Sequence, residues 1–172
     1  MLDRDDVELD VYSSTIIYGD DFYRQFDSQF TELFERARKT ANVNYHGYAS
    51  NAEVREALSR SHIFAYPSTW EETSCLSAIE AGMAGLQIVT TNLGALYETV
   101  NVWGKIVAYN ADRKRLAQNY ANALSEAIDQ YWSPDNQNRL HEQHCFYKRF
   151  YSWEARILEW KDLLRKIKLK EG

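Results

Sequence analysis

Two glutamates, Glu72 and Glu80, have the residue type and spacing best suited to chemistry in this chain. A short apolar run that ends at Pro67 precedes them, and the segment that joins them reads Glu72-Thr73-Ser74-Cys75-Leu76-Ser77-Ala78-Ile79-Glu80. We expect a helix over Ser74–Met83, so one carboxylate precedes the helix and the other lies two turns inside it. At about 1.5 Å per residue, this spacing corresponds to at most about 12 Å along a helix.

The start of this helix is suited to an anion. Thr73 and Ser74 are good N-cap residues, and the free N–H groups of the first turn attract negative charge together with the helix dipole. A diphosphate would fit there, and a carboxylate on either side can accept charge-assisted hydrogen bonds from hydroxyl groups. The pattern therefore indicates a nucleotide diphosphate sugar, with hydroxyls on its ribose and on its sugar. The structural alternative is a glutamate that the helix dipole stabilises without any ligand.

The elements that must position these residues alternate between strands and helices. Val7, Leu9 and Val11 alternate with polar residues and predict a strand, with Thr15–Tyr18 as a second candidate. Apolar residues spaced by three and four predict an amphipathic helix over about 22–39. Further strands are expected at 43–46, 62–66, 87–90 and 105–107. Further helices are expected at 51–60 with Asn51 as its cap, at 74–83 with Gly85 as its C-cap, and at 96–100, 112–131, 135–149 and 153–168.

This order of elements predicts an α/β fold. We expect a single Rossmann-like parallel sheet with helices on both faces and a helical C-terminal tail. Ligands of such sheets bind beyond the carboxyl ends of the strands. The loops after His46, Tyr66 and Thr90 would lie at that edge of the sheet.

The composition is that of an ordinary soluble globular chain and excludes several classes of function. The 172 residues are 45% hydrophobic and 26% charged, with a formal net charge of −5. Such an acidic chain lacks the basic surface that general nucleic-acid binding requires. No apolar run approaches the roughly 20 residues of a membrane span, the start has no signal-peptide core, and the two cysteines imply no disulfide framework. We expect a cytoplasmic protein whose basic C-terminal end is solvated rather than bound to an anionic membrane.

Short motifs between residues 43 and 100 also carry a family resemblance. They are Tyr45-His46-Gly47, Ser61-His62, Tyr66-Pro67-Ser68, Glu72-Thr73-Ser74-Cys75-Leu76, Glu80-Ala81-Gly82-Met83-Ala84-Gly85, Gln87-Ile88-Val89 and Gly94-Ala95-Leu96-Tyr97-Glu98. In this order and spacing they resemble the carboxy-terminal, donor-binding half of a GT-B glycosyltransferase of the family 4 type, the glycosyl transferases group 1.

The resemblance implies a role for each matching position. Glu72 would be the catalytic residue, in contact with hydroxyls of the transferred sugar, and Glu80 would hold the ribose hydroxyls. The turn at Gly47 and Tyr48 would lie beside the base. The rest of the donor-binding set would be Pro67, Ser68, Thr73, Ser74, Cys75 and Leu76. The resemblance also implies a retaining transferase that needs no cofactor or metal, because the helix start replaces a cation on the leaving diphosphate.

The resemblance further implies parts that this sequence does not match. The family places an arginine and a lysine upstream, against the diphosphate, and has an amino-terminal domain that binds the acceptor. We therefore expect residues 1–172 to be the nucleotide-sugar-binding domain of a partial GT-B fold, with 135–172 as a helical tail. It would be inactive without its acceptor domain, and some tail aromatics, such as Trp153 and Trp160, would be exposed. The expected function is donor binding in polysaccharide or glycoconjugate synthesis.

Two other functions stay open at the level of sequence. A sugar-nucleotide epimerase can share the GT-B architecture, and a non-catalytic α/β interaction module could retain the scaffold alone. Cys75 is not expected to be a nucleophile, because no histidine stands near it in a recognisable pattern.

Overall fold

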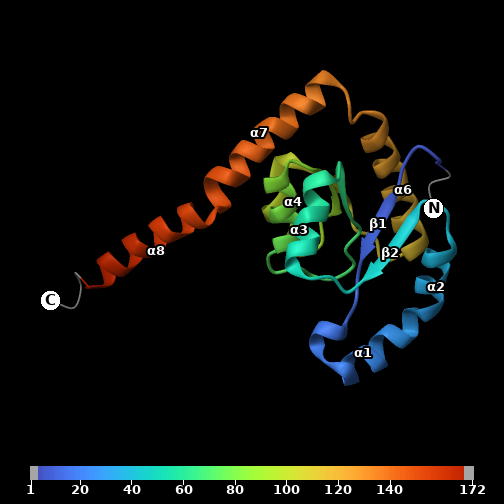
Figure 1. The fold of residues 1–172 in the computed structure, drawn as a ribbon. Helices are drawn as coiled ribbons and strands as arrows, with labels where there is room; N and C mark the ends of the chain where they lie inside the picture. The colour runs from blue at the N-terminus through green and yellow to red at the C-terminus, as the bar shows by residue number, and fades with distance from the viewer. Residues whose placement is uncertain (1–3, 169–172) are drawn as a thin grey trace. The chain divides into compact units, whose positions relative to one another are not determined.

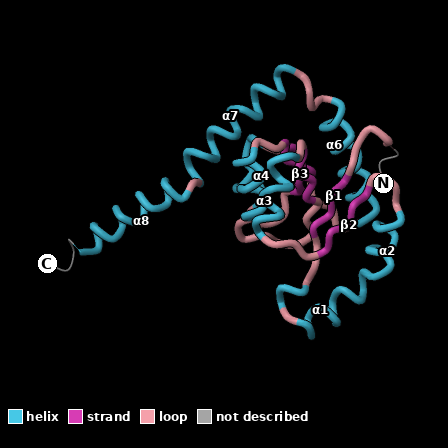
Figure 2. Tube along the Cα trace, viewed as in Figure 1, coloured by secondary structure: helices cyan, strands magenta, loops and turns pink. Residues whose placement is uncertain are grey.

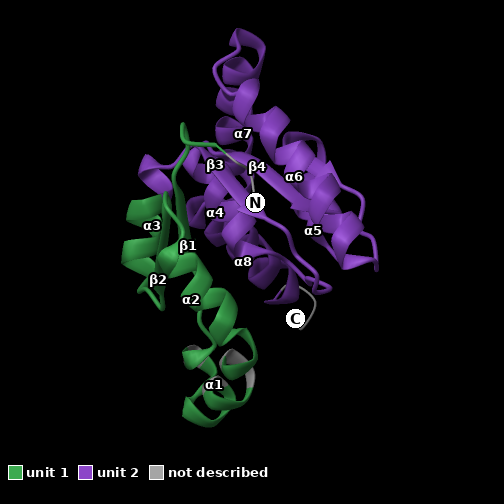
Figure 3. Cartoon of the chain, turned by 90° about the vertical axis from the view of Figure 1, so that its right-hand side faces the viewer, with its two compact units in different colours: residues 1–57 green, residues 58–172 purple. Residues whose placement is uncertain are grey.

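The structure, a computed structural model, describes residues 4–168 (Figure 1). The outermost residues of the predicted 1–172 domain and 135–172 tail lie outside that range. Helices and parallel strands alternate along the described chain (Figure 2). The chain forms two compact units, Met1–Ala57 and Leu58–Gly172 (Figure 3), and each unit has its own sheet.

The first unit contains a two-stranded parallel sheet. Strands β1 (Leu9–Tyr12) and β2 (Val43–Gly47) pair from Leu9 opposite Val43, with a register shift between Val11 and Tyr12. The predicted strand at Leu9 is confirmed, whereas the second candidate is a 3₁₀ turn, Ile16–Tyr18. The connection consists of α1 (Asp20–Phe26), a 3₁₀ turn (Asp27–Phe30) and α2 (Thr31–Lys39).

The single helix predicted over 22–39 is therefore wrong. The interruption lies at Ser28, whose hydroxyl donates to the Gln25 carbonyl at 3.2 Å. Such a local side-chain bond competes with the helical ladder, which a periodicity of apolar residues does not reveal.

The helix after β2 spans the predicted residues 51–60 but has a different cap. In α3 (Asn51–Arg60), Ser50 is the cap, because its Oγ accepts from the Glu53 amide at 3.3 Å. Glu53 returns a bond from its Oε2 to the Ser50 amide at 2.6 Å, which completes a capping box. The hydrogen bonds from Ser50 also hold the pKa of Glu53 below its usual value. Asn51, the predicted cap, is instead the first helical residue.

The second unit is a three-stranded parallel sheet with helices on both faces. Strand β4 (Gln87–Thr91) is central and entirely buried, with β3 (Ile63–Tyr66) on one side and β5 (Lys105–Val107) on the other. The helices of this unit are α4 (Leu76–Ala84), α5 (Leu96–Val100), α6 (Arg113–Asp129), α7 (Pro134–Tyr151) and α8 (Trp153–Lys168). Gly85 is the C-cap of α4, as predicted.

The α/β class with parallel strands and flanking helices is confirmed. The hydrogen bonds divide the described strands into two sheets, β1-β2 and β3-β4-β5, where the sequence suggested a single one. Alternation along a sequence predicts strands and their connections. It does not specify which strands pair, because pairing depends on contacts between distant residues.

Two apolar clusters cover the two faces of the larger sheet. Ile88 belongs to the cluster with α4 and α7, and its neighbour Val89 belongs to the cluster with α6. Successive residues of a strand point to opposite faces, so β4 supplies both clusters. The hydroxyl of Tyr147, on α7, is fully buried and donates to the Thr99 carbonyl at 2.8 Å.

The helical C-terminal segment is packed at its beginning and exposed at its end. Tyr147 belongs to the core, but Trp153 is 81% exposed and Trp160 is 62% exposed, as expected for some of the tail aromatics. Among residues 4–168, no helix has the length and apolar character needed to cross a membrane.

We expect Gly82→Ala to destabilise the chain by about 1–3 kcal/mol, the usual cost of overpacking a core. A Cβ at this position would lie closer than 3.0 Å to the ring of Tyr147. Urea unfolding followed by circular dichroism measures the change. Ser77→Ala, at an exposed position of the same helix, serves as the control and should stay within about 0.5 kcal/mol. Equal midpoints for Gly82→Ala and the wild type would show that this contact tolerates a methyl group.

Candidate functional site

Glu72 lies in the loop between β3 and α4 and is held through its backbone and its side chain. Its backbone forms an isolated parallel bridge with Gly94, and its carbonyl accepts from the Ala95 amide at 2.6 Å. Its Oε1 accepts from the hydroxyl of Tyr66, the last residue of β3, at 2.5 Å. The half-buried carboxylate is thus hydrogen-bonded to the residue at the carboxyl end of a strand, where the sequence predicted a ligand site.

The approach of Gly94 to Glu72 requires a glycine. Gly94 has φ +62°, a left-handed conformation that residues with a Cβ rarely adopt. A Cβ there would also lie closer than 3.0 Å to the backbone N and O of Glu72. Any larger residue would therefore displace the Glu72 backbone.

Tyr66 is itself fixed by the sheet. Its carbonyl accepts from the Thr90 hydroxyl at 2.9 Å, and its ring stacks on Phe64 with centroids 5.6 Å apart. Burial, and then the hydrogen bond to Glu72, raise the pKa of the Tyr66 phenol above its usual value. The phenol therefore stays protonated and remains the donor to Glu72.

The start of α4 differs from the prediction in its cap. Cys75 is the N-cap residue, and its carbonyl accepts from the amides of Ala78 at 3.1 Å and Ile79 at 3.2 Å. The predicted caps Thr73 and Ser74 lie outside the helix, because the loop that Glu72 anchors delays the first helical turn until Leu76.

The amides at this helix start have no internal partner. Among residues 4–168, the backbone N–H groups of Ser74, Cys75 and Leu76 make no hydrogen bond. Burial, followed by the charge of Glu72, raises the pKa of the buried Cys75 thiol, so the thiol stays protonated. This result supports the expectation that Cys75 is not a nucleophile.

Glu80 lies one turn after the start of α4, on the less buried face of the helix. Its neighbours Ile79 and Ala81 are buried, while Glu80 shares its helix face with the exposed residues Leu76 and Ser77. Within the described part of the chain, the Glu80 carboxylate has no hydrogen-bond or ion-pair partner. The structure thus leaves this carboxylate available to a ligand.

Ser68 shapes the loop that carries Glu72. It is 7% exposed, its Oγ bonds both the amide and the carbonyl of Trp70, and its carbonyl accepts from the Thr91 hydroxyl at 2.8 Å. Pro67 and Thr73 are exposed in the same loop. Donor contacts of Pro67, Ser68 and Thr73 stay predictions.

The other predicted donor contacts lie in the first unit. Gly47 ends β2 with φ +69°, and Tyr48 follows it with 60% of its surface exposed. Their position beside the base of a donor stays a prediction.

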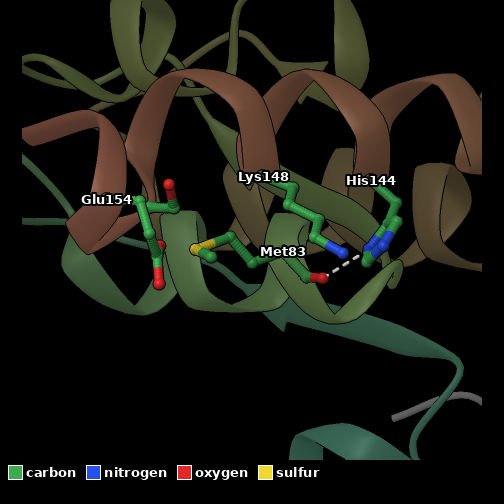
Figure 4. Close-up of a pocket in the computed structure, with 5 residues that line it drawn as sticks. Met83, His144, Lys148 and Glu154 are labelled. Carbon is green, nitrogen blue, oxygen red and sulfur yellow. Dashed lines mark hydrogen bonds between the residues drawn. The ribbon is translucent and has the colours of Figure 1, made fainter.

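A pocket of about 480 Å³ lies at the other end of α4 (Figure 4). Met83, His144, Lys148, Ser152 and Glu154 line it, and His144 Nδ1 lies 2.6 Å from the Met83 carbonyl. This pocket contains none of the residues that the sequence predicted for the donor.

Comparison with known proteins identifies the family. The family model for glycosyl transferases group 1 matches residues 14–143, which is more than half of the chain. The chain belongs to the glycosyl transferases group 1 family. The resemblance in its motifs is therefore confirmed.

The fold of this group 1 chain also has a counterpart among solved structures. The crystal structure of Anabaena Alr3699/HepE in complex with UDP-glucose is similar, with a TM-score of 0.69 and 14% sequence identity. The match covers 95% of this chain and 42% of the Anabaena chain, so this chain spans less than half of its length. No match was found among curated proteins.

Two residues of the site were not selected from the sequence, although both stand within the family motifs. Tyr66 precedes Pro67, and Gly94 begins the segment Gly94-Ala95-Leu96-Tyr97-Glu98. The available signal for Tyr66 was its position as the last residue of a predicted strand, just before an acidic loop. Its bond to Glu72 depends on the shape of the loop, which residue spacing does not predict.

We expect Glu72→Gln to lower the pKa of Tyr66. The carboxylate accepts a bond from the protonated phenol and so favours that form, whereas a neutral amide favours it less. The phenol of the variant should ionise at a lower pH than that of the wild type. The measurement is an NMR titration of ¹³Cζ-labelled tyrosine, with Tyr66→Phe used to assign the signal.

Glu71→Gln is the matched control, because Glu71 is exposed beside Glu72 and should not affect the titration. An unchanged Tyr66 curve in Glu72→Gln would contradict the hydrogen bond.

Proposed function

We propose that the second unit binds the nucleotide diphosphate sugar donor of a glycosyltransferase. The observation that carries this proposal is the placement of Glu72, whose side chain bonds to the end of β3. It lies immediately before a helix start whose first three amides have no partner within the described part of the chain. Membership in the glycosyl transferases group 1 family supports it, as does the likeness to a structure solved with UDP-glucose.

The diphosphate, the ribose and the sugar of the donor each have a proposed partner in this unit. The diphosphate binds the amides of Ser74, Cys75 and Leu76, at the positive end of the α4 dipole. Glu80, farther along the helix, accepts hydrogen bonds from the ribose hydroxyls, and Glu72 accepts them from the sugar.

Charge develops on the diphosphate as its bond to the sugar breaks. Fixed N–H groups aimed at that charge stabilise the transition state, and they need no reorganisation when the reaction occurs. We propose that the helix start serves this purpose without a metal. The acceptor oxygen then bonds to the same face of the sugar and gives its proton to the departing diphosphate, so that the configuration is retained.

Acceptor binding is assigned to a separate amino-terminal domain, as the resemblance implies. The 172-residue chain is then expected to bind the donor and to transfer no sugar by itself. The complete protein would act in the synthesis of a polysaccharide or glycoconjugate.

Titration calorimetry with UDP, GDP and ADP tests the proposal. We expect one of these nucleotides to bind the wild type and Glu80→Ala to weaken its binding about tenfold or more, because hydrogen bonds to charged groups contribute about 1.5–3 kcal/mol. Glu142→Ala, at an exposed position of α7, should leave the affinity unchanged. No heat of binding from any of the three at millimolar concentration would contradict a donor site in this chain.

A further inference from the structure

The carboxylate of Glu72 is occupied on one oxygen only. Tyr66 donates to Oε1, and among residues 4–168 the second oxygen, Oε2, has no hydrogen-bond partner. The backbone of the same residue is held by Gly94 and Ala95. Glu72 is thus held through its backbone and through Oε1, and Oε2 remains available as an acceptor.

We propose that Tyr66 is a positioning residue that orients Glu72 toward the sugar of the donor, with Gly94 fixing the backbone beneath it. The inference rests on the proposed function, because it assigns a purpose to Glu72 that only a bound sugar requires. Tyr66 acts through Glu72 and does not touch the donor itself.

The physical basis is preorganisation. A glutamate in an exposed loop samples several rotamers, and ordering such a side chain costs about 0.5–1.5 kcal/mol when a ligand binds. The hydrogen bond from Tyr66 orders the Glu72 side chain during folding, so this cost does not oppose sugar binding. Tyr66 can do so because Thr90 and Phe64 hold it in place within the sheet. The sugar hydroxyl then meets an acceptor that is already in place.

Two buried tyrosines of the second unit provide a contrast with the partly buried Tyr66. Tyr120 donates to the Val89 carbonyl at 2.7 Å, and Tyr147 donates to the Thr99 carbonyl at 2.8 Å. Both hydroxyls satisfy backbone acceptors inside the core, which serves stability. Tyr66 instead donates to a carboxylate whose other oxygen is free, which suggests a role in binding.

The test separates the sugar from the nucleotide. Calorimetry gives the affinity of each variant for the diphosphate that the wild type binds and for the matching diphosphate-hexoses: glucose, galactose, mannose and N-acetylglucosamine. The ratio of the two affinities reports what the sugar adds. We expect Tyr66→Phe to lower this ratio about fivefold while the affinity for the bare diphosphate stays unchanged.

Further variants exclude a general loss of structure. Gly94→Ala should also lower the ratio, and Tyr66→Phe should add little to Glu72→Gln, because both remove the same interaction. Tyr147→Phe is the matched control, because its hydroxyl donates to the Thr99 carbonyl. It should lower the unfolding midpoint and leave the ratio at its wild-type value.

The outcomes distinguish this inference from the function on which it rests. In one outcome the wild type binds a diphosphate, binds a diphosphate-hexose more tightly, and Tyr66→Phe has the same ratio of the two affinities. The positioning role is then overturned and the donor site stands. If Glu80→Ala weakens the diphosphate but no hexose adds affinity in the wild type, the role of Glu72 toward the sugar is overturned together with that of Tyr66. If the wild type binds no diphosphate, both proposals are overturned.

Discussion

The close contact between α4 and α7 at Gly82 and Tyr147 is the constraint on which the second unit depends. The tyrosine ring occupies the space that a side chain at position 82 would need, so the two helices pack without a gap. Buried small residues, Ala78 and Ala81, let α4 lie close to β4. Because the helix cannot slide, its start stays at the carboxyl edge of the sheet, beside the loop that carries Glu72.

A second constraint comes from the hydroxyl groups of β4. Thr90 and Thr91 are fully buried, where an unpaired hydroxyl would be costly. Thr90 donates to the carbonyl of Tyr66 and Thr91 to that of Ser68, so consecutive residues of the central strand hold the end of β3 and the following loop. The polar side chains of the strand interior thus support the loop that carries the candidate catalytic carboxylate.

This arrangement suits a site that must work by electrostatics. A reaction whose charge develops on a departing diphosphate is accelerated by donors that are already oriented, and α4 offers such donors at its start. Family membership places the chain among the glycosyl transferases group 1, and the matched Anabaena structure holds UDP-glucose. The roles proposed for Glu72 toward the sugar and for Glu80 toward the ribose stay predictions.

The amino-acid sequence by itself determined the order of strands and helices, the glycine cap of α4 and the motifs that identify the family. These features follow from propensities and spacings among neighbouring residues, which the chain expresses locally. The caps that the sequence predicted at Asn51, Thr73 and Ser74 were wrong, because a cap depends on where the first helical turn closes. Only the tertiary structure decided the division into two sheets, the bond from Tyr66 to Glu72 and the contact of Gly94 with that residue. These contacts join residues that come together only in the folded chain, and no pattern among neighbouring residues specifies them.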